Sequence, residues 1–128
     1  MSIRVVRLGS PRVAGEGLRV GTVRRPPRGV PKSEYASRDL YDVWLPELAP
    51  SEELLKEAQQ ASDERAWLRF VRRYRTEMKR PEAARLLTLL AALSHQTDFS
   101  VGCYCADESH CHRSVLKELL REHAADIV

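Results

Sequence analysis

Eleven residues near the C-terminal end of the chain, CYCADESHCHR at positions 103–113, concentrate side chains that can bind metals, transfer protons or act as nucleophiles. They include every cysteine of the 128-residue protein, two histidines, two carboxylates and one arginine. An apolar run, FSV, precedes this segment, and SVLKELLREH, which has helical periodicity, follows it. The sequence therefore predicts a functional site in a loop between a strand and a helix.

One hypothesis for this loop is an anion site with a reactive thiol. A helix that begins in the loop offers unpaired backbone N–H groups and a partial positive charge, which together bind phosphate-like groups. Arg113 and Ser114, in the first turn, would add donors to a bound anion. Cys111 or Cys105 is the candidate nucleophile, because a thiol close to a helix start and to basic side chains has a lowered pKa.

His112 is the candidate acid or base of such an enzyme, and Asp107 or Glu108 would orient it or exchange protons with it. The layout is similar to the loops of cysteine phosphatases and rhodaneses, which also place a cysteine after a strand and an arginine at a helix start. Seven residues separate Cys105 from Arg113, a longer spacing than those phosphatases have, so the similarity is one of architecture. We expect a cysteine-dependent transferase or hydrolase that needs no cofactor.

A second hypothesis for the same loop is a zinc site. Cys103, Cys105, Cys111 and His112 form a C-x-C-x5-C-H pattern of four soft ligands, which zinc accepts. The spacing differs from the common C-x2-C pairs, and the two acids and His110 are further candidate ligands. A third interpretation is structural, with Cys103 as a small core residue and a loop that only caps the helix.

The second half of the predicted anion site comes from the basic first third of the chain. Residues 1–38 carry nine Arg or Lys and two Glu, whereas residues 39–66 carry eight acids and two bases. Arg24 and Arg28 lie in a loop rich in proline, and we expect them to hold the anion together with Arg113. Alternatively, the opposite charge runs pair with each other in the fold. A nucleic-acid partner ranks third, because the sequence contains no recognition helix and no aromatic RNA-binding pattern.

Hydrophobic periodicity, together with helix caps and turn residues, predicts the strands and helices that position these loops. Ser51 and Asp63 are predicted helix caps, and Pro81 suits the first turn of a third helix. The predicted strands are 3–8, 18–24 and 99–105, with a turn or hairpin over 11–17, and the predicted helices are 51–61, 63–78, 81–93 and 112–124. The predicted core faces of the last three helices are Trp67, Phe70, Val71, Tyr74 and Met78, then Leu86, Leu87, Leu89, Leu90 and Leu93, then Val115, Leu116, Leu119 and Leu120.

This order of elements predicts one compact α/β domain over residues 1–128, with a small, mostly parallel sheet flanked by helices in a Rossmann-like layering. Ligands of such sheets bind outside the carboxyl ends of the strands, where the cysteine loop would lie. No run of the sequence approaches the roughly 20 apolar residues of a membrane span, and no signal peptide is evident. We therefore expect a cytoplasmic monomer or homodimer that binds a small anionic ligand and no membrane.

Four segments, VRRPPRGVPK, YDVWLPELAPSEEL, WLRFVRRYRTEM and DESHCHRSVLKELL, resemble in order and spacing the domain of unknown function 488 family, in its YeaO-like branch. The resemblance spans about residues 18–122. Its most specific parts are ELAPS with Trp44 upstream, the R-Y-x-x-E segment at Arg73, Tyr74 and Glu77, and the C-H-R triplet. The resemblance implies a compact α/β domain and brings no assigned reaction.

Two positions depart from the pattern of that family. The family commonly has R-L-W-P-R-G where this chain has RRPPRG, so Arg24 and Arg28 match its arginines and Pro26 replaces its tryptophan. Many YeaO-like members follow their acid pair with asparagine and have no cysteine or histidine there, whereas this chain has the C-H-R triplet of the other branch. A chemistry shared by the whole family therefore cannot depend on Cys111.

Overall fold

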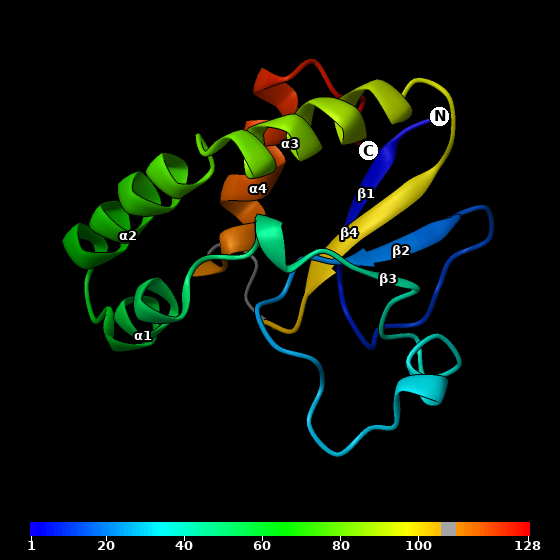
Figure 1. Ribbon diagram of the computed structural model, residues 1–128, viewed down its shortest axis with the longest axis horizontal. Coiled ribbons are helices and arrows are strands. Elements are labelled where there is room, and N and C mark those ends of the chain that lie inside the picture. Colours follow the sequence, from blue (N-terminus) through cyan, green and yellow to red (C-terminus); the bar gives the residue numbers. More distant parts are fainter. Residues whose placement is uncertain (106–109) are drawn as a thin grey trace.

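The computed structural model describes residues 1–105 and 110–128, which form an all-parallel sheet of four strands and four α-helices (Figure 1). The strands are β1 (Ile3–Arg7), β2 (Leu18–Gly21), β3 (Val43–Trp44) and β4 (Phe99–Cys103). Their spatial order is β1-β4-β2-β3, so the last strand lies between the first two. The predicted α/β fold with a small parallel sheet is confirmed.

The central strand β4 is buried along its whole length, and its composition matches its two different faces. Phe99 and Val101 face the main core, which the helices complete. Ser100 and Gly102 face the opposite side, because successive side chains of a strand alternate. A β-carbon at position 102 would lie 2.5 Å from the carbonyl oxygen of Val6, so only glycine allows β1 to pair this closely.

Local signals set the starts of the helices, as predicted. Ser51 accepts a hydrogen bond from the backbone N–H of Leu54 at 3.3 Å. Asp63 accepts one from the N–H of Ala66 at 2.8 Å, and Pro81 begins the third helix. The helices are α1 (Glu52–Gln60), α2 (Glu64–Glu77), α3 (Pro81–Leu93) and α4 (His112–Glu122), with short 3-10 turns η1 (Lys32–Glu34) and η2 (Pro46–Leu48). Their buried apolar residues include Trp67, Phe70, Tyr74, Met78, Leu87, Leu90, Val115, Leu116, Leu119 and Leu120.

On the face of the sheet opposite the main core, a buried ion pair attaches the neighbouring loops to strand β2. Arg19 of β2 is fully buried and donates from Nε and Nη2 to the carboxylate of Glu16 at 2.8 and 3.0 Å. Its Nη1 donates to the carbonyl oxygens of Ser10 and Asp39 at 2.8 and 2.7 Å. The hydroxyl of Ser100 donates to Glu16 at 3.0 Å. The pair therefore joins the loops that follow β1 and precede β3 to the centre of the sheet.

The topology corrects several local predictions. The segment 11–17 is not a hairpin turn, because β4 lies between β1 and β2 and all three strands run parallel. β2 ends at Gly21 and β4 at Cys103, so both strands are shorter than predicted. Leu89 and Leu93 are 52% and 38% exposed, because the core face of α3 is narrower than its leucine content suggests.

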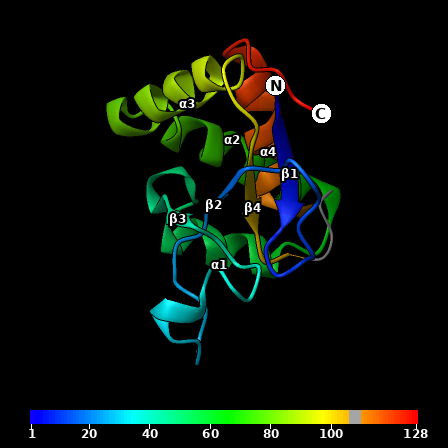
Figure 2. The same ribbon diagram turned by 90° about the vertical axis from the view of Figure 1, so that its right-hand side faces the viewer.

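The connection between β2 and β3, residues 22–42, extends from the carboxyl edge of the sheet, at the end of the molecule opposite the two chain termini (Figures 1 and 2). Apart from the short turn η1 it has no regular structure, as its prolines predict. Among residues 1–105 and 110–128, no helix combines the length and apolar character that crossing a membrane requires.

Candidate thiol and anion site

The three cysteines lie at the carboxyl edge of the sheet, where β4 ends and α4 begins. Cys103 is the last residue of β4, and Cys111 is the N-cap residue of α4. His112 and Arg113 occupy the first turn of this helix. The carboxyl end of a parallel strand lies close to the start of the helix that follows it, so the fold itself brings these groups together.

Cys103, Cys111 and His112 form a buried cluster. The sulfur atoms of Cys103 and Cys111 are 2.6 Å apart, and Cys111 Sγ lies 3.8 Å from His112 Nδ1. His112 Nε2 lies 2.7 Å from the carbonyl oxygen of Thr22. A carbonyl oxygen only accepts hydrogen bonds, so Nε2 carries the hydrogen and Nδ1 presents its lone pair to the sulfur. Burial lowers the pKa of His112, which keeps the imidazole uncharged at neutral pH.

Cys105 is the exposed member of the cysteine group. Hydrogen bonds from the thiols of Cys103 and Cys111 lower its pKa, and the charge of Arg113 acts in the same direction. These effects outweigh burial and hold the pKa of Cys105 well below its usual range. Hydrogen bonding to Cys105 raises the pKa of Cys103 to about 11, and hydrogen bonding also raises that of Cys111. Of the three thiols, Cys105 therefore ionises most readily.

Arg113 is buried, and its charge acts on Cys105. The residue is 4% exposed, and within the described part of the chain neither Nε nor Nη1 has a hydrogen-bond partner. Two buried guanidinium nitrogens without a partner among the described residues are costly, so an anion that reaches them would complete their environment. The hydroxyl of Ser114 already donates to the carbonyl oxygen of Cys111 at 2.8 Å.

A hollow of about 460 Å³ lies against the cysteine cluster. Its described lining residues include two cysteines, one histidine and several cationic side chains: Cys103, Cys105, His112, Arg24, Arg25, Arg28 and Lys56. Among the lining residues that the structure describes, Glu52 is the one acid, and it pairs with Arg25 at 2.9 Å. The arginine loop and the cysteine loop therefore border the same hollow, and the hollow carries an excess of positive charge.

Arg24 also fixes a wall of this hollow. Its Nε and Nη2 donate to the carbonyl oxygens of Pro50 and Ala49 at 3.0 and 2.9 Å. These bonds hold the arginine loop against the start of α1. Arg28, by contrast, is exposed, and its side chain is the more available of the two predicted anion ligands.

The family-specific segments form a clamp next to Arg24. The hydroxyl of Ser51 donates to the carboxylate of Glu77 at 2.6 Å, and the hydroxyl of Tyr74 donates to the carbonyl oxygen of Leu48 at 2.6 Å. The ELAPS segment is thereby tied to the R-Y-x-x-E segment of α2. These motif residues position the wall of the hollow, and they do not line it.

The opposite charge runs of the sequence do pair in part. Arg12 donates to Asp42 at 2.9 Å, and Arg25 pairs with Glu52. Both pairs join the basic first third to the acidic segment that follows it, as the alternative interpretation of the charges predicts. Arg28, by contrast with Arg12 and Arg25, forms no ion pair with a described residue.

Two predicted site residues are not among the described residues, and three residues of the site were not predicted from the sequence. Asp107 and Glu108 fall outside the described residues, so their predicted roles stay predictions. Sequence reasoning missed Arg25, Lys56 and the carbonyl of Thr22. The charge run could have indicated Arg25, but Lys56 and Thr22 reach the site only through tertiary packing, and no local pattern marks them.

Comparison with known proteins gives one family model that matches the chain. A family model described as DUF488-N3a, active DUF488-N3 subclade, matches residues 3–124. The match covers nearly the whole chain and confirms the resemblance that the sequence segments carry. No curated protein and no solved structure matches the chain.

Proposed function

The chain belongs to the domain of unknown function 488 family, and we propose that it is a thiol-dependent enzyme that acts on a small anionic substrate. Cys105 is the nucleophile. Arg113, the first turn of α4 and the cationic side chains of the hollow hold the anion. The reaction is a group transfer or a hydrolysis.

In the proposed reaction, the thiolate of Cys105 attacks the electrophilic centre of the bound substrate. A bond forms between Cys105 Sγ and this centre, and the bond to the leaving group breaks with its electron pair. The leaving group takes a proton from solvent. Water or a second substrate then attacks the adduct and loses a proton, and the sulfur leaves again as the thiolate.

The position of Cys105 carries this proposal. The residue is exposed, lines a hollow with four cationic side chains, and receives hydrogen bonds from two thiols. Reactive cysteines are those with a lowered pKa and access to solvent, whereas buried cysteines are mostly inert. The description of the matched subclade as active agrees with an enzyme.

We expect Cys105 to react with iodoacetamide at least about tenfold faster than Cys103 and Cys111 at pH 7, because Cys105 alone of the three is exposed and has a lowered pKa. Its rate constant should change little between about pH 6 and pH 8, whereas an ordinary thiol slows roughly tenfold for each unit below its pKa of about 8.5. Peptide mass spectrometry of time points measures all three residues in one sample. Uniform labelling, or a tenfold slope per unit for Cys105, would remove it as the nucleophile.

The anion half of the proposal is tested in the same assay. Orthophosphate should slow the alkylation of Cys105, because the anion occupies the hollow that the reagent must enter. Arg28→Met should weaken this protection. Arg72→Met makes the same change at an exposed position of α2 and should leave the protection as it is. Equal protection in both variants would exclude Arg28 from the anion site.

A zinc site is the second candidate, and the hydrogen bond from His112 Nε2 to Thr22 favours it. Metal-binding histidines commonly donate their other ring N–H to a carbonyl oxygen. Here that bond leaves Nδ1 close to Cys111 Sγ, so the sulfurs of Cys103 and Cys111 and the nitrogen of His112 could hold a zinc ion, whereas the fourth predicted ligand, Cys105, lies outside this group. Against this candidate, the sulfurs of Cys103 and Cys111 at 2.6 Å would have to separate to about 3.8 Å around a tetrahedral zinc.

Metal content separates the two candidates. We expect the protein, purified under reducing conditions without chelators, to contain well below one zinc per chain by mass spectrometry of the elements. A zinc site would instead give about one equivalent, and a chelator would then lower the thermal unfolding midpoint. Stoichiometric zinc together with slow alkylation of Cys105 would replace the thiol proposal with the metal one.

A further inference from the structure

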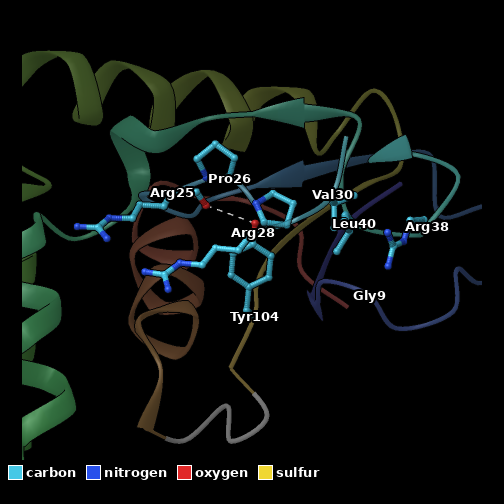
Figure 3. A pocket seen from close by; sticks show the side chains of 9 residues that line it. Gly9, Arg25, Pro26, Arg28, Val30, Arg38, Leu40 and Tyr104 are labelled. Carbon is cyan, nitrogen blue, oxygen red and sulfur yellow. Dashed lines mark hydrogen bonds between the residues drawn. The ribbon is translucent and has the colours of Figure 1, made fainter. Parts of the chain in front are cut away.

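A second hollow, of about 550 Å³, adjoins the first one and has a different chemistry. Its walls are largely apolar, and Figure 3 shows the proline rings and the ring of Tyr104 near its centre. Val30 and Leu40 contribute further apolar surface. A hollow of this size and character suits a flat apolar or aromatic group rather than a second phosphate.

The two hollows share part of their walls. Arg25, Arg28 and Tyr104 line both of them. In Figure 3 the side chains of Arg25 and Arg28 extend to the same side of Tyr104. Tyr104 directly precedes the proposed nucleophile, Cys105, in the chain. One ligand with an anionic end and a flat end could therefore occupy both hollows at once.

The ring of Tyr104 is held in place before any ligand arrives. Its hydroxyl donates to the carbonyl oxygen of Arg25 at 3.4 Å, and its own carbonyl oxygen accepts from Arg7 Nε at 3.3 Å. The side chain is half-buried. A ring that is already fixed loses little further entropy when another ring stacks on it, which favours stacking as the recognition mode.

The charges around the second hollow also select the ligand. Arg25, Arg28 and Arg38 line it, and no carboxylate is among its described lining residues. A guanidinium attracts both an anion and the face of an aromatic ring. A neutral apolar group alone would leave the positive charge of this hollow uncompensated, whereas a ring attached to a phosphate matches both the charge and the apolar surface.

We propose that the second hollow binds the planar base of a nucleotide whose phosphate lies in the first hollow, next to Cys105. This inference rests on the proposed function and specifies its substrate class as a nucleotide. The base stacks on Tyr104, and Arg28 bridges the base and the phosphate. Val30 and Leu40 exclude water from the edge of the base.

Isothermal titration of the full chain with adenosine monophosphate, ribose 5-phosphate and inorganic phosphate tests the proposal. We expect adenosine monophosphate to bind at least about tenfold more tightly than ribose 5-phosphate, because one base–aromatic stack contributes that much. It should also protect Cys105 from iodoacetamide at a correspondingly lower concentration. Equal affinities of the two compounds would overturn the base-binding hollow.

Variants of the second hollow test whether the preference for adenosine monophosphate arises there. Tyr104→Ala should remove the preference for adenosine monophosphate, whereas Tyr104→Phe keeps the ring and should keep the preference. Val30→Trp fills the second hollow without touching the first and should also remove the preference. This variant serves if Tyr104→Ala fails to fold. A preference that survives Val30→Trp contradicts the proposal.

The failure of this inference is distinguishable from the failure of the proposed function. If ribose 5-phosphate and adenosine monophosphate protect Cys105 equally, the anion site is supported and the base-binding hollow is contradicted. If neither compound binds or protects Cys105, both the anion site and the base-binding hollow are contradicted. If Tyr104→Ala weakens the binding of all phosphates equally, the ring only positions the anion site, and the base-binding proposal is overturned.

Discussion

Arg19→Met is expected to lower the free energy of unfolding by about 3–5 kcal/mol at pH 7, because it leaves a buried carboxylate without its partner. Arg19 is fully buried and makes two hydrogen bonds to Glu16 and one each to the carbonyl oxygens of Ser10 and Asp39. Methionine fills much of the same volume and restores none of these donors. Urea unfolding followed by the fluorescence of the buried Trp67 measures the loss.

Two controls separate this effect from a general cost of replacing arginine. Arg121→Met removes an exposed ion pair with Glu118 and should change stability by less than about 1 kcal/mol. Adding Glu16→Leu to Arg19→Met removes the orphaned carboxylate and should recover part of the loss. A cost below about 1 kcal/mol for Arg19→Met would show that this ion pair does not hold the loops on the sheet.

The pH dependence of the same variant has a definite sign. Burial opposes the ionisation of Glu16, but the hydrogen bonds from Arg19 and Ser100 outweigh it, so the pKa of Glu16 lies below its usual range. The pair therefore contributes its full stability above the unfolded-state pKa of about 4.3, and loses it as the pH falls through the lower folded-state value. The deficit of Arg19→Met should shrink over this acidic range.

Sequence reasoning succeeds where the determinants are local. The caps at Ser51 and Asp63, the helical start at Pro81 and the buried stripe along α2 all depend on residues within a few positions of each other. The cluster at 103–113 is found for the same reason, since its residues are neighbours in the chain before they are neighbours in space.

The misses are non-local. A turn rich in proline and glycine fits a hairpin or a longer connection equally well, and only the insertion of β4 between β1 and β2 decides between them. The two-residue strand β3 is too short to carry a pattern of its own. The burial of Arg19 depends on loops from both sides of it, and a charged residue in a short strand is more often exposed.

The site shows the same division. The spacing of cysteine, histidine and arginine predicted which groups gather at the end of β4, and the loop containing Arg28 was expected to face them. The second hollow beside Tyr104 follows from how the connection 22–42 folds at the edge of the sheet. Nothing in the sequence fixes that path, because its prolines exclude regular structure without specifying another.

Arg113→Met should have opposite effects on function and on stability. The protein carries a buried guanidinium whose Nε and Nη1 have no partner among the described residues, and this costs free energy in the unliganded state. Methionine removes the charge at similar volume, so we expect the free energy of unfolding to rise by about 1–3 kcal/mol without ligand. Anion binding should be lost, because the proposed anion pairs with the guanidinium of Arg113.

The reactivity of Cys105 should change together with anion binding. The charge of Arg113 favours the thiolate of Cys105, but less than the hydrogen bonds from Cys103 and Cys111 do. Its removal should therefore raise the pKa of Cys105 only in part, and any slowing of the alkylation should be largest at the acidic end of the range, near pH 6. Arg72→Met, on the exposed surface of α2, should alter none of the three properties. A stabilised variant that has lost phosphate protection is the outcome expected of an anion site that includes Arg113, whose buried Nε and Nη1 have no partner among the described residues. A variant that is destabilised and keeps phosphate protection would instead make Arg113 a structural residue, and the anion would have to be held by the exposed arginines of the 22–42 connection alone.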